Sequence, residues 1–400
     1  MNEVAIIGIG RTEWGRFPDR DVEDLAREAI LAALKDANLN WTDIQYIVGG
    51  IDPWSGFPGI TSGSVVQANL GYLGIPCTSV WNACATGSYA TDLGRSLILG
   101  GMYDTVLCFG SFKAHGGFFP TIGTADDPNN LDAQRFRLLG KTNPTMFAYQ
   151  AMRRMHNFGM TEDDLVAIKV KNSKHGKSNP YARYKKEFTA EEVLQSPMLV
   201  YPLRLFEVVA TSDGAAAVIL CNMKKAKNLT TNPVQLAAAY GPAPKYPNVD
   251  IGLSPFATQS EISTLRTPAG IERPHERQVA FGAYEQAGIG PDDVDFAEVY
   301  DLAVAMELDW MEDIGICKMG EAEHLLRKGE TAIGGKIPVN PSGGIASFGE
   351  APTGQALCQL CELVTQLRGI AGPRQVHNAN VGLAINKGLA NSISCLIAKI

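Results

Sequence analysis

The sequence predicts a layered α/β fold built from two similar halves, and three observations lead to this prediction. The chain has 400 residues, whereas a single hydrophobic core usually stops growing at roughly 250–300 residues. It opens with a strand–helix–strand pattern, the repeating unit of layered α/β folds. The same pattern returns 250 residues later, which indicates an internal duplication.

The first copy of the pattern lies in the first 50 residues. Val4–Gly8 is a short apolar run that ends in glycine, and it predicts a buried strand. Asp21–Ala37 places its apolar residues close to a 3.6-residue period, which predicts an amphipathic helix. Ile44–Gly49 predicts a second strand.

In the second copy, a helix again ends in a short turn, an acidic residue and an apolar strand. The copies correspond at Ala37 and Ala287, Asp43 and Asp293, and Ile44 and Val294. We therefore expect an N-terminal half at 1–225 and a C-terminal half at 226–400, joined near Asn222–Pro233.

Other apolar runs and turns predict the remaining elements of both halves. These are a strand and turn at Thr78–Gly87, helices at Ser88–Leu99 and Gln355–Leu367, strands at Thr105–Gly110 and Ser212–Leu220, and a closing part of the sheet at Ala384–Ile400. Residues 111–200 show no β–α alternation, so we expect an inserted loop region there.

Composition excludes several classes of protein. Hydrophobic residues are 45% and charged residues 19% of the chain, which is ordinary for a globular protein and argues against disorder. A net charge of −7 argues against a nucleic-acid surface. No run reaches the ~18 apolar residues of a membrane span, and the N-terminus looks like a strand rather than a signal peptide.

We therefore expect a cytoplasmic protein whose eight cysteines are reduced thiols. Cys358 and Cys361 form a C-x-x-C inside a helical pattern, without a second pair. Core packing is the expected role of both, and no metal site is expected in this chain. Gly8-x-Gly10 lacks the third glycine of a dinucleotide fingerprint, since Glu13 stands there.

Cys84 is the sharpest local feature. It lies in N-A-C-A-T-G-S, between a predicted strand and the start of an apolar helix. Unsatisfied N–H groups and the helix dipole favour a thiolate at such a place, which is the placement expected of a nucleophile. The alternative is a small buried core residue.

A basic stretch lies in the region of the expected insertion. It contains Lys169, Lys171, Lys174, His175, Lys177, Arg183, Lys185 and Lys186. These side chains either contact a phosphorylated cofactor such as the ADP part of coenzyme A or form a solvated surface. As candidate coenzyme A contacts we take Lys174, Lys177, Arg183 and, from a glycine-rich segment, Ser347.

Several segments in the same order resemble the thiolase superfamily over nearly the whole chain. They are AIIGIGRTEW, NACATGS, PLRLFEVVATSDGAAAVIL, the run from EVYDLA to EDIGICKMGEAEHLL, GGKIPVNPSGGIASFGEAPTG and VHNANVG. The chain is most similar to the sterol-carrier-protein-type thiolases and their bacterial relatives. The resemblance implies a five-layered αβαβα arrangement of two duplicated halves.

The resemblance also implies a mechanism. Cys84 stands where these enzymes keep the nucleophile that accepts an acyl group from a 3-oxoacyl-CoA, and coenzyme A, a substrate, then removes that group. This chemistry needs an acid/base and oxyanion-stabilising donors. The resemblance implies that backbone N–H groups of Cys84 and of the Val381–Gly382 turn supply one oxyanion hole, with Asn380 beside them.

The sequence departs from the family pattern in three places. The G-H-P-x-G loop has Glu350 in place of its histidine, the H-D-C-F motif begins with Tyr300, and the C-terminal C-x-G-G pattern reads His377 to Gly382. Glu350 is the candidate base if burial raises its pKa, His377 could supply the lost imidazole, and Tyr300 could donate a hydrogen bond. The alternatives are a capping carboxylate, a core histidine and a packed aromatic residue.

These departures favour an unusual substrate. We expect a thiolase that cleaves a bulky or aromatic 3-oxoacyl-CoA such as benzoylsuccinyl-CoA, as a homodimer with a small zinc-ribbon/OB partner like those of similar relatives. Candidate pocket residues are Trp54, Phe57, Trp81, Phe118 and Phe119. A retro-aldolase acting on a steroid-type β-hydroxyacyl-CoA and a non-catalytic acyl-CoA-binding scaffold are the alternatives. Retention of Cys84 favours acyl transfer over the retro-aldolase.

Overall fold

The computed structural model describes residues 3–114, 143–229, 232–244 and 274–400. Nine strands of this part of the chain form one sheet, in the order β3-β2-β4-β7-β1-β8-β11-β10-β9. They are β1 (Val4–Arg11), β2 (Tyr46–Ile51), β3 (Cys77–Ser79), β4 (Thr105–Phe112), β7 (Gly214–Asn222), β8 (Val234–Tyr240), β9 (Phe296–Glu298), β10 (Val381–Lys387) and β11 (Ile393–Lys399). A separate two-stranded sheet pairs β5 (Met198–Val200) with β6 (Leu203–Arg204).

Helices cover and separate the strands. They are α1 (Val22–Asp36), α2 (Phe57–Ile60), α3 (Ser62–Leu70), α4 (Thr86–Leu99), α6 (Asn143–Phe158), α7 (Glu162–Gly176), α8 (Ala190–Leu194), α9 (Met223–Leu229), α10 (Pro274–Ala287), α11 (Ala305–Asp313), α12 (Ala322–Arg327), α13 (Gly344–Phe348) and α14 (Pro352–Leu367). None of the helices in the described ranges is long and apolar enough to cross a membrane.

The two parts of the large sheet repeat one topology. In the first part, β1 pairs antiparallel with β7, β7 antiparallel with β4, and β4 parallel with β2. In the second part, β8, β11, β10 and β9 repeat these pairings in the same order. A short antiparallel pairing of Ala5 and Ile6 with Gln235 and Val234 joins the two parts.

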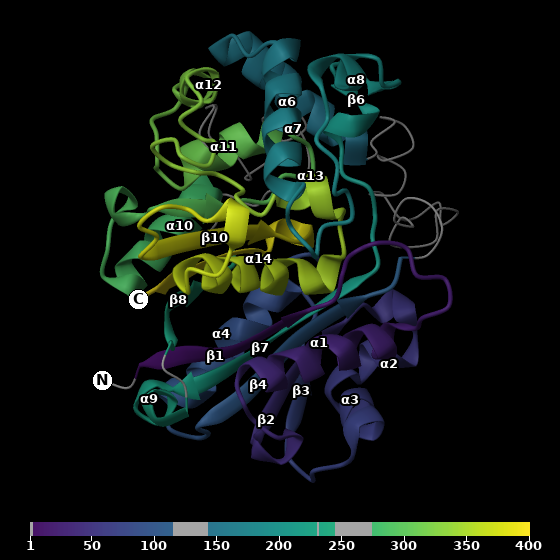
Figure 1. Ribbon diagram of the computed structural model, residues 1–400, viewed down its shortest axis with the longest axis vertical. Helices are drawn as coiled ribbons and strands as arrows, with labels where there is room; N and C mark the ends of the chain where they lie inside the picture. The colour runs from purple at the N-terminus through teal and green to yellow at the C-terminus, as the bar shows by residue number, and fades with distance from the viewer. Residues whose placement is uncertain (1–2, 115–142, 230–231, 245–273) are drawn as a thin grey trace, which may run out of the picture.

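The helices complete a five-layered thiolase-like arrangement (Figure 1). α1 packs on β1, β7 and β4, while α10 packs on β8 and β11. Between the two parts of the sheet, α4 and α14 contact each other and strands from both parts. All of α14 is buried, because it has strands on two sides.

The repeated pattern at the start of each half also appears in detail. Short 3₁₀ turns occupy Trp41–Asp43 and Pro291–Asp293. In each, the carboxylate of the third residue accepts a hydrogen bond from the backbone N–H that precedes the turn, at 2.8 Å in both Asp43 and Asp293. The same hydrogen bond therefore occurs in both halves, in the turn between the first helix and the strand that follows it.

The expected loop region is the main error in the predicted elements. Within 111–200, α6 and α7 are regular helices, and α7 begins with a capping box between Thr161 and Asp164. The sequence shows no β–α alternation here because α7 follows α6 directly, with no strand between them.

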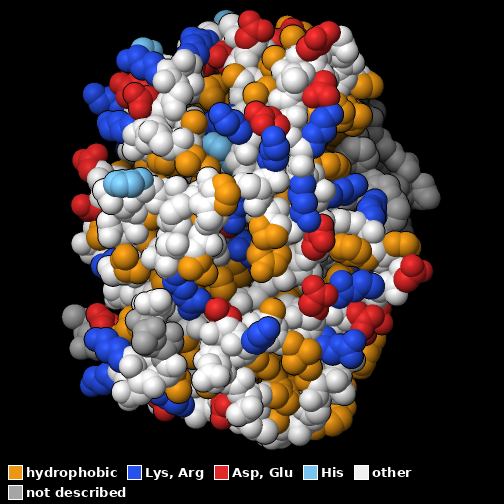
Figure 2. All heavy atoms as spheres, viewed as in Figure 1, with side chains coloured by type: hydrophobic (Ala, Val, Ile, Leu, Met, Phe, Trp, Pro, Cys, Tyr) orange, Lys and Arg blue, Asp and Glu red, His pale blue; other side chains and the backbone are white. Residues whose placement is uncertain are grey.

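Charged side chains of both signs are interspersed on the face shown in Figure 2. Several of the lysines on the outside of the molecule pair with glutamates, as Lys185 does with Glu13. Pairs of this kind stabilise a protein little when solvent-exposed.

Candidate active site

A strained turn presents Cys84 two residues before α4. Ala83 has φ of +50°, a conformation that costs a non-glycine residue energy and often occurs at functional sites. The backbone N–H of Asn82 donates to the Thr86 hydroxyl at 2.9 Å, and that hydroxyl donates to the Ala83 carbonyl at 2.6 Å. These bonds hold the turn, and the Cys84 side chain remains partly exposed.

Glu350 approaches Cys84 from the loop between α13 and α14. Its backbone N–H donates to the Ala210 carbonyl at 2.7 Å, and its carbonyl accepts from the Ser212 N–H at 2.8 Å. Gly349 has φ of +75°, and a Cβ there would lie 2.2 Å from the Ser212 hydroxyl oxygen, so only glycine fits before the glutamate. The Cys84 thiol donates to Glu350 Oε1 at 2.8 Å.

Tyr300 completes the cluster from the segment after β9. Its hydroxyl donates to the same Glu350 oxygen that accepts from the Cys84 thiol. The side chain is 1% exposed, and its carbonyl accepts from the Trp310 indole N–H at 2.8 Å. The structure therefore brings together three of the predicted site residues, from elements 266 residues apart in the chain.

Burial dominates the electrostatics of this trio. It raises the pKa of Glu350, while the hydrogen bonds from Cys84 and Tyr300 lower it in part. Burial, followed by the charge of Glu350, raises the pKa of Cys84 well above its usual value. The expectation of a resting thiolate is therefore wrong, because the carboxylate disfavours a second negative charge beside it. In the structure, the Cys84 thiol donates to the Glu350 side chain instead.

The structure does not bring His377, Asn380 and Gly382 to this trio. His377 and Asn380 are exposed and precede β10, and Gly382 packs on Phe296. β10 runs parallel to β9, so the end of β10 that lies near Tyr300 is its carboxyl end. The three predicted residues are at the opposite end of the strand.

Gly388, just after β10, lies against the Cys84 turn, where Gly382 was expected. A Cβ on Gly388 would lie 2.0 Å from the Asn82 carbonyl oxygen and 3.2 Å from the Ala85 nitrogen. The backbone after β10 therefore touches the Cys84 turn. Sequence reasoning missed this residue, although the glycine directly after an apolar strand was a usable signal.

The predicted coenzyme A contacts lie in different surroundings. Ser347 is 1% exposed and donates to the Asn172 carbonyl at 3.2 Å, so its hydroxyl is used inside the protein. Arg183 donates to the Thr211 carbonyl at 2.5 Å and to the Ser212 hydroxyl. Lys174 and Lys177 are exposed, and Lys177 pairs with Glu187 at 3.3 Å. The basic stretch is thus not one continuous patch.

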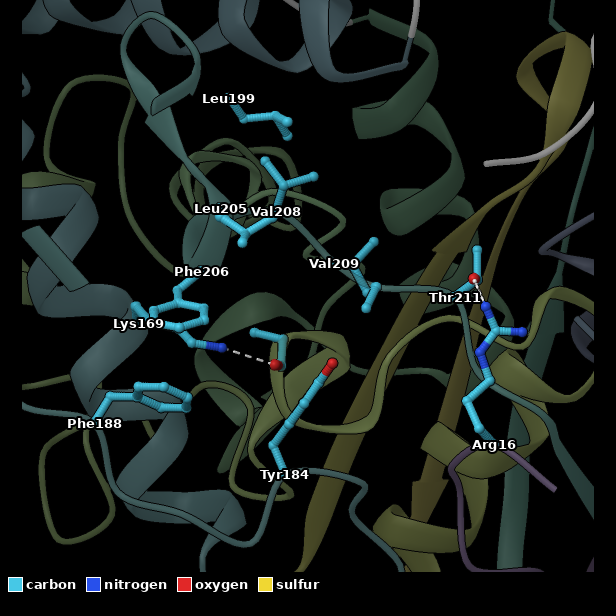
Figure 3. A pocket seen from close by; sticks show the side chains of 12 residues that line it. Arg16, Lys169, Tyr184, Phe188, Leu199, Leu205, Phe206, Val208, Val209 and Thr211 are labelled. Atoms are coloured by element: carbon cyan, nitrogen blue, oxygen red, sulfur yellow. Dashed lines mark hydrogen bonds between the residues drawn. The ribbon is translucent and has the colours of Figure 1, made fainter. Parts of the chain in front are cut away.

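A cavity of about 340 Å³ (Figure 3) includes in its wall Val209 and Ala210, which hydrogen-bond to Leu302 and Glu350. It is lined mainly by apolar and aromatic side chains, with one basic residue at each end. The lining residues are Arg16, Lys169, Tyr184, Phe188, Leu199, Leu205, Phe206, Val208, Val209, Ala210, Thr211 and Ala346. Of the aromatic residues predicted for the pocket, Trp54 and Trp81 contact each other edge-on instead, Phe57 is 71% exposed, and Phe118 and Phe119 lie outside the described residues.

Comparison with known proteins identifies the family. Residues 259–397 match the family described as thiolase C-terminal domain-like. The chain is 32% identical to the acetyl-CoA acetyltransferase of Methanothermobacter thermautotrophicus over 97% of each chain. It is 32% identical to sterol carrier protein 2 of Bos taurus, over 100% of this chain and 72% of that protein.

Two further relatives match over most of both chains. Benzoylsuccinyl-CoA thiolase subunit BbsB of Thauera aromatica is 31% identical, over 94% of this chain and 91% of the relative. The solved structure of the Ltp2-ChsH2(DUF35) aldolase is 26% identical, with a TM-score of 0.80 over 99% of this chain and 97% of the other.

The fold and the curated relatives together define the class of this protein, an enzyme of acyl transfer. The chain belongs to the thiolase superfamily, in the branch of the sterol-carrier-protein-type thiolases, and is an acyltransferase of that superfamily.

Proposed function

We propose that this protein is a thiolase that transfers an acyl group from a 3-oxoacyl-CoA to coenzyme A through Cys84, with Glu350 as its acid/base. The observation that carries the proposal is the 2.8 Å hydrogen bond from the Cys84 thiol to the Glu350 carboxylate. A nucleophile within hydrogen-bond reach of a base is the basic requirement of covalent catalysis. No cation contributes to the shifted pKa of Glu350 among the described residues, so its basicity is not reduced by an ion pair.

In the first half-reaction, Cys84 sulfur attacks the 3-oxo carbonyl while its proton moves to Glu350. The bond between the second and third acyl carbons then breaks, and its electron pair leaves as the enolate of a shortened acyl-CoA. Glu350 returns the proton to that carbon. The products are an acyl-Cys84 thioester and a shortened acyl-CoA whose enolate carbon has been protonated. Glu350 thus serves first as base and then as acid.

In the second half-reaction, the Glu350 carboxylate takes the thiol proton of coenzyme A. The coenzyme A sulfur attacks the thioester, Cys84 leaves as the thiolate, and Glu350 returns the proton to it. Tyr300 orients Glu350 through its hydrogen bond. Glu350 thus carries out the proton transfers of both half-reactions.

For the substrate, we propose a bulky or aromatic 3-oxoacyl-CoA such as benzoylsuccinyl-CoA. The name of the Thauera aromatica relative and the aromatic lining of the cavity support this. The alternative is retro-aldol cleavage of a β-hydroxyacyl-CoA, which the name of the Ltp2-ChsH2(DUF35) aldolase structure favours. Retention of Cys84 beside a base favours acyl transfer, because aldol cleavage needs no nucleophile.

We further propose that each chain consists of two halves that meet near residue 225. Two such chains form a cytoplasmic homodimer, which works with a small zinc-ribbon/OB subunit. The division follows the repeated topology of the sheet. Dimerisation is supported by β3, which lies at an edge of the described sheet, and by the exposed apolar residues Phe57, Ile60 and Tyr72 of the neighbouring segments. A cytoplasmic location agrees with eight free cysteines.

Mass spectrometry of the intact protein and of its Cys84 peptide tests the proposed function. The protein is mixed with a panel of acyl-CoA thioesters that includes benzoyl-CoA, with and without a zinc-ribbon/OB protein. We expect an acyl mass on the Cys84 peptide that free coenzyme A removes. No adduct together with cleavage of a β-hydroxyacyl-CoA would establish the retro-aldolase instead, and coenzyme A binding alone would indicate a scaffold.

A further inference from the structure

Lys169 differs from the other buried basic side chains of the described residues. Four lysine or arginine residues there are buried, and three of them pair with carboxylates: Arg11 and Arg374 with Glu362, and Arg154 with three acids. Lys169 is 4% exposed, and its ammonium donates to the Ala346 carbonyl at 2.9 Å. Within the described ranges, no carboxylate lies within ion-pair distance of it.

Aromatic side chains surround this ammonium, and Lys169 lines the cavity. Figure 3 shows Lys169 between Phe188, Phe206 and Tyr184. Its nitrogen lies 5.1 Å from the centroid of the Phe188 ring and 5.9 Å from that of the Tyr184 ring. Burial lowers the pKa of Lys169 to about 8, the expected cost of a charge with little water around it. A lysine has three N–H donors, and one carbonyl accepts only one of them.

The cavity adjoins the catalytic trio through one extended segment of its wall. Val208 and Ala303 form a β-bridge, and Val209 N–H donates to the Leu302 carbonyl at 2.9 Å, just after Tyr300. The next wall residue, Ala210, accepts from the Glu350 N–H. The wall of the cavity is therefore hydrogen-bonded to the two loops that carry Tyr300 and Glu350.

We propose that Lys169 binds a carboxylate carried by the acyl part of the substrate, so that the enzyme takes acyl-CoA thioesters with an acidic acyl group. This inference rests on the proposed acyl transfer. An apolar cavity with one buried ammonium suits a hydrocarbon or aromatic acyl group with a single anionic end. Arg16 is exposed at the other end of the cavity and adds attraction for an anion. A benzoylsuccinyl group contains one such carboxylate.

Two acidic residues lie close enough to influence this site. Burial raises the pKa of Glu207 to about 7 and that of Asp301 to about 8, so near neutral pH their negative charge is reduced. Each also has a backbone partner, since Glu207 accepts from the Arg204 N–H at 2.7 Å and Asp301 from the Ile345 N–H at 2.7 Å. Their carboxylates therefore do not take the place of a ligand on Lys169.

The phosphates of coenzyme A are a second possible source of an anion. They carry more charge than one ammonium balances, and they usually meet exposed basic or backbone donors. The aromatic lining and the 4% exposure of Lys169 favour a carboxylate.

A binding experiment in the Cys84→Ala protein tests the proposal without acyl transfer. Dissociation constants are measured for succinyl-CoA, butyryl-CoA and free coenzyme A; the two acyl groups have equal length and differ in the terminal carboxylate. We expect succinyl-CoA to bind roughly ten- to a hundredfold more tightly than butyryl-CoA, the usual range for a buried charge-assisted hydrogen bond. The added substitution Lys169→Met should reduce this ratio to below threefold, whereas Lys169→Arg should keep a preference for succinyl-CoA.

The matched control is Lys227→Met, which removes an exposed lysine of α9 and should leave all three constants unchanged. A ratio near one with Lys169 present would overturn the proposal even if Lys169→Met did not fold. A parallel loss of affinity for all three ligands in Lys169→Met would assign the anion to a coenzyme A phosphate instead, and would also overturn it. Failure of acyl transfer itself is detected separately, on Cys84.

Discussion

Two buried polar clusters of this protein differ in how their charges are balanced. Around Arg154, all five guanidinium N–H groups donate to Asp309, Glu312 or Glu323 at 2.8–3.0 Å. Around Glu350, one carboxylate accepts from a thiol and a phenol, both weak acids. The first cluster pairs its charges with one another, whereas the second pairs its carboxylate with two groups that each carry a proton.

This difference indicates which buried charges are structural and which are chemical. The Arg154 cluster joins α6 to α11 and α12. Its charged groups pair with one another, so we expect them to stay ionised during a reaction. The raised pKa of Glu350 moves it toward the thiol and enolate with which it would exchange a proton. Substitutions in the two clusters should therefore separate stability from activity.

The largest expected effect is that of Glu350→Gln on activity. Loss of the base should lower the rate of Cys84 acylation about 10²–10⁴-fold, measured by single-turnover mass spectrometry. Stability should stay equal or rise, because the raised pKa means that the folded state disfavours the ionised carboxylate. The matched control is Glu312→Gln, an equally conservative change in the other cluster, which should lower stability and leave the acylation rate unchanged.

The second largest effect is expected of Arg154→Met. This substitution should lower the free energy of unfolding by about 3–5 kcal/mol, because three buried carboxylates lose their cation. Urea denaturation followed by circular dichroism measures this loss. Per folded molecule, the acylation rate should stay within twofold of the unsubstituted protein. A large loss of activity in fully folded Arg154→Met protein would show that the two clusters are not independent.

Tyr300→Phe should have a smaller effect, a roughly tenfold fall in the acylation rate, since one hydrogen bond to a charged group is lost. That bond lowers the pKa of Glu350. Its removal should therefore raise this pKa further and move the acid limb of the pH–rate profile to higher pH. An unchanged acid limb would contradict the assignment of Tyr300 as the residue that orients Glu350.

The smallest effect is expected of His377→Ala. His377 is exposed and precedes β10, at the end away from Cys84, so its removal should change the steady-state rate by less than twofold. Gly388→Ala, at the other end of β10, is the contrasting variant. Its Cβ would meet the Asn82 carbonyl at 2.0 Å, so it should displace the Cys84 turn and slow acylation.

Much of the fold could be predicted from local sequence. The helix α1 has a clear period because one of its faces packs on the sheet, and the neighbouring strands are continuous apolar runs because both of their faces are buried. The duplication was visible because both copies keep the same turn chemistry at Asp43 and Asp293. In contrast, α6 and α7 were missed, since they belong to a helical insertion outside the repeated pattern.

The site was less predictable, because its parts meet only in the tertiary structure. Cys84 has a local signal, but its contact with Glu350 spans 266 residues and was expected only from the family resemblance. Gly382 and Gly388 flank one strand, and strand direction decides which of them faces Cys84. Lys169 was grouped with the other basic residues of its stretch, because nothing local distinguishes a buried lysine from an exposed one.

The pH dependence of Cys84 acylation tests the central claim, that Glu350 is the base for Cys84, most directly. A protonated Glu350 cannot accept the thiol proton, so the single-turnover rate should fall with decreasing pH, with an apparent pKa above the ordinary value of a glutamate. In Glu350→Gln protein this limb should disappear along with most of the rate. Equal rates and profiles in the two proteins, rising only as the free thiol ionises, would contradict the account.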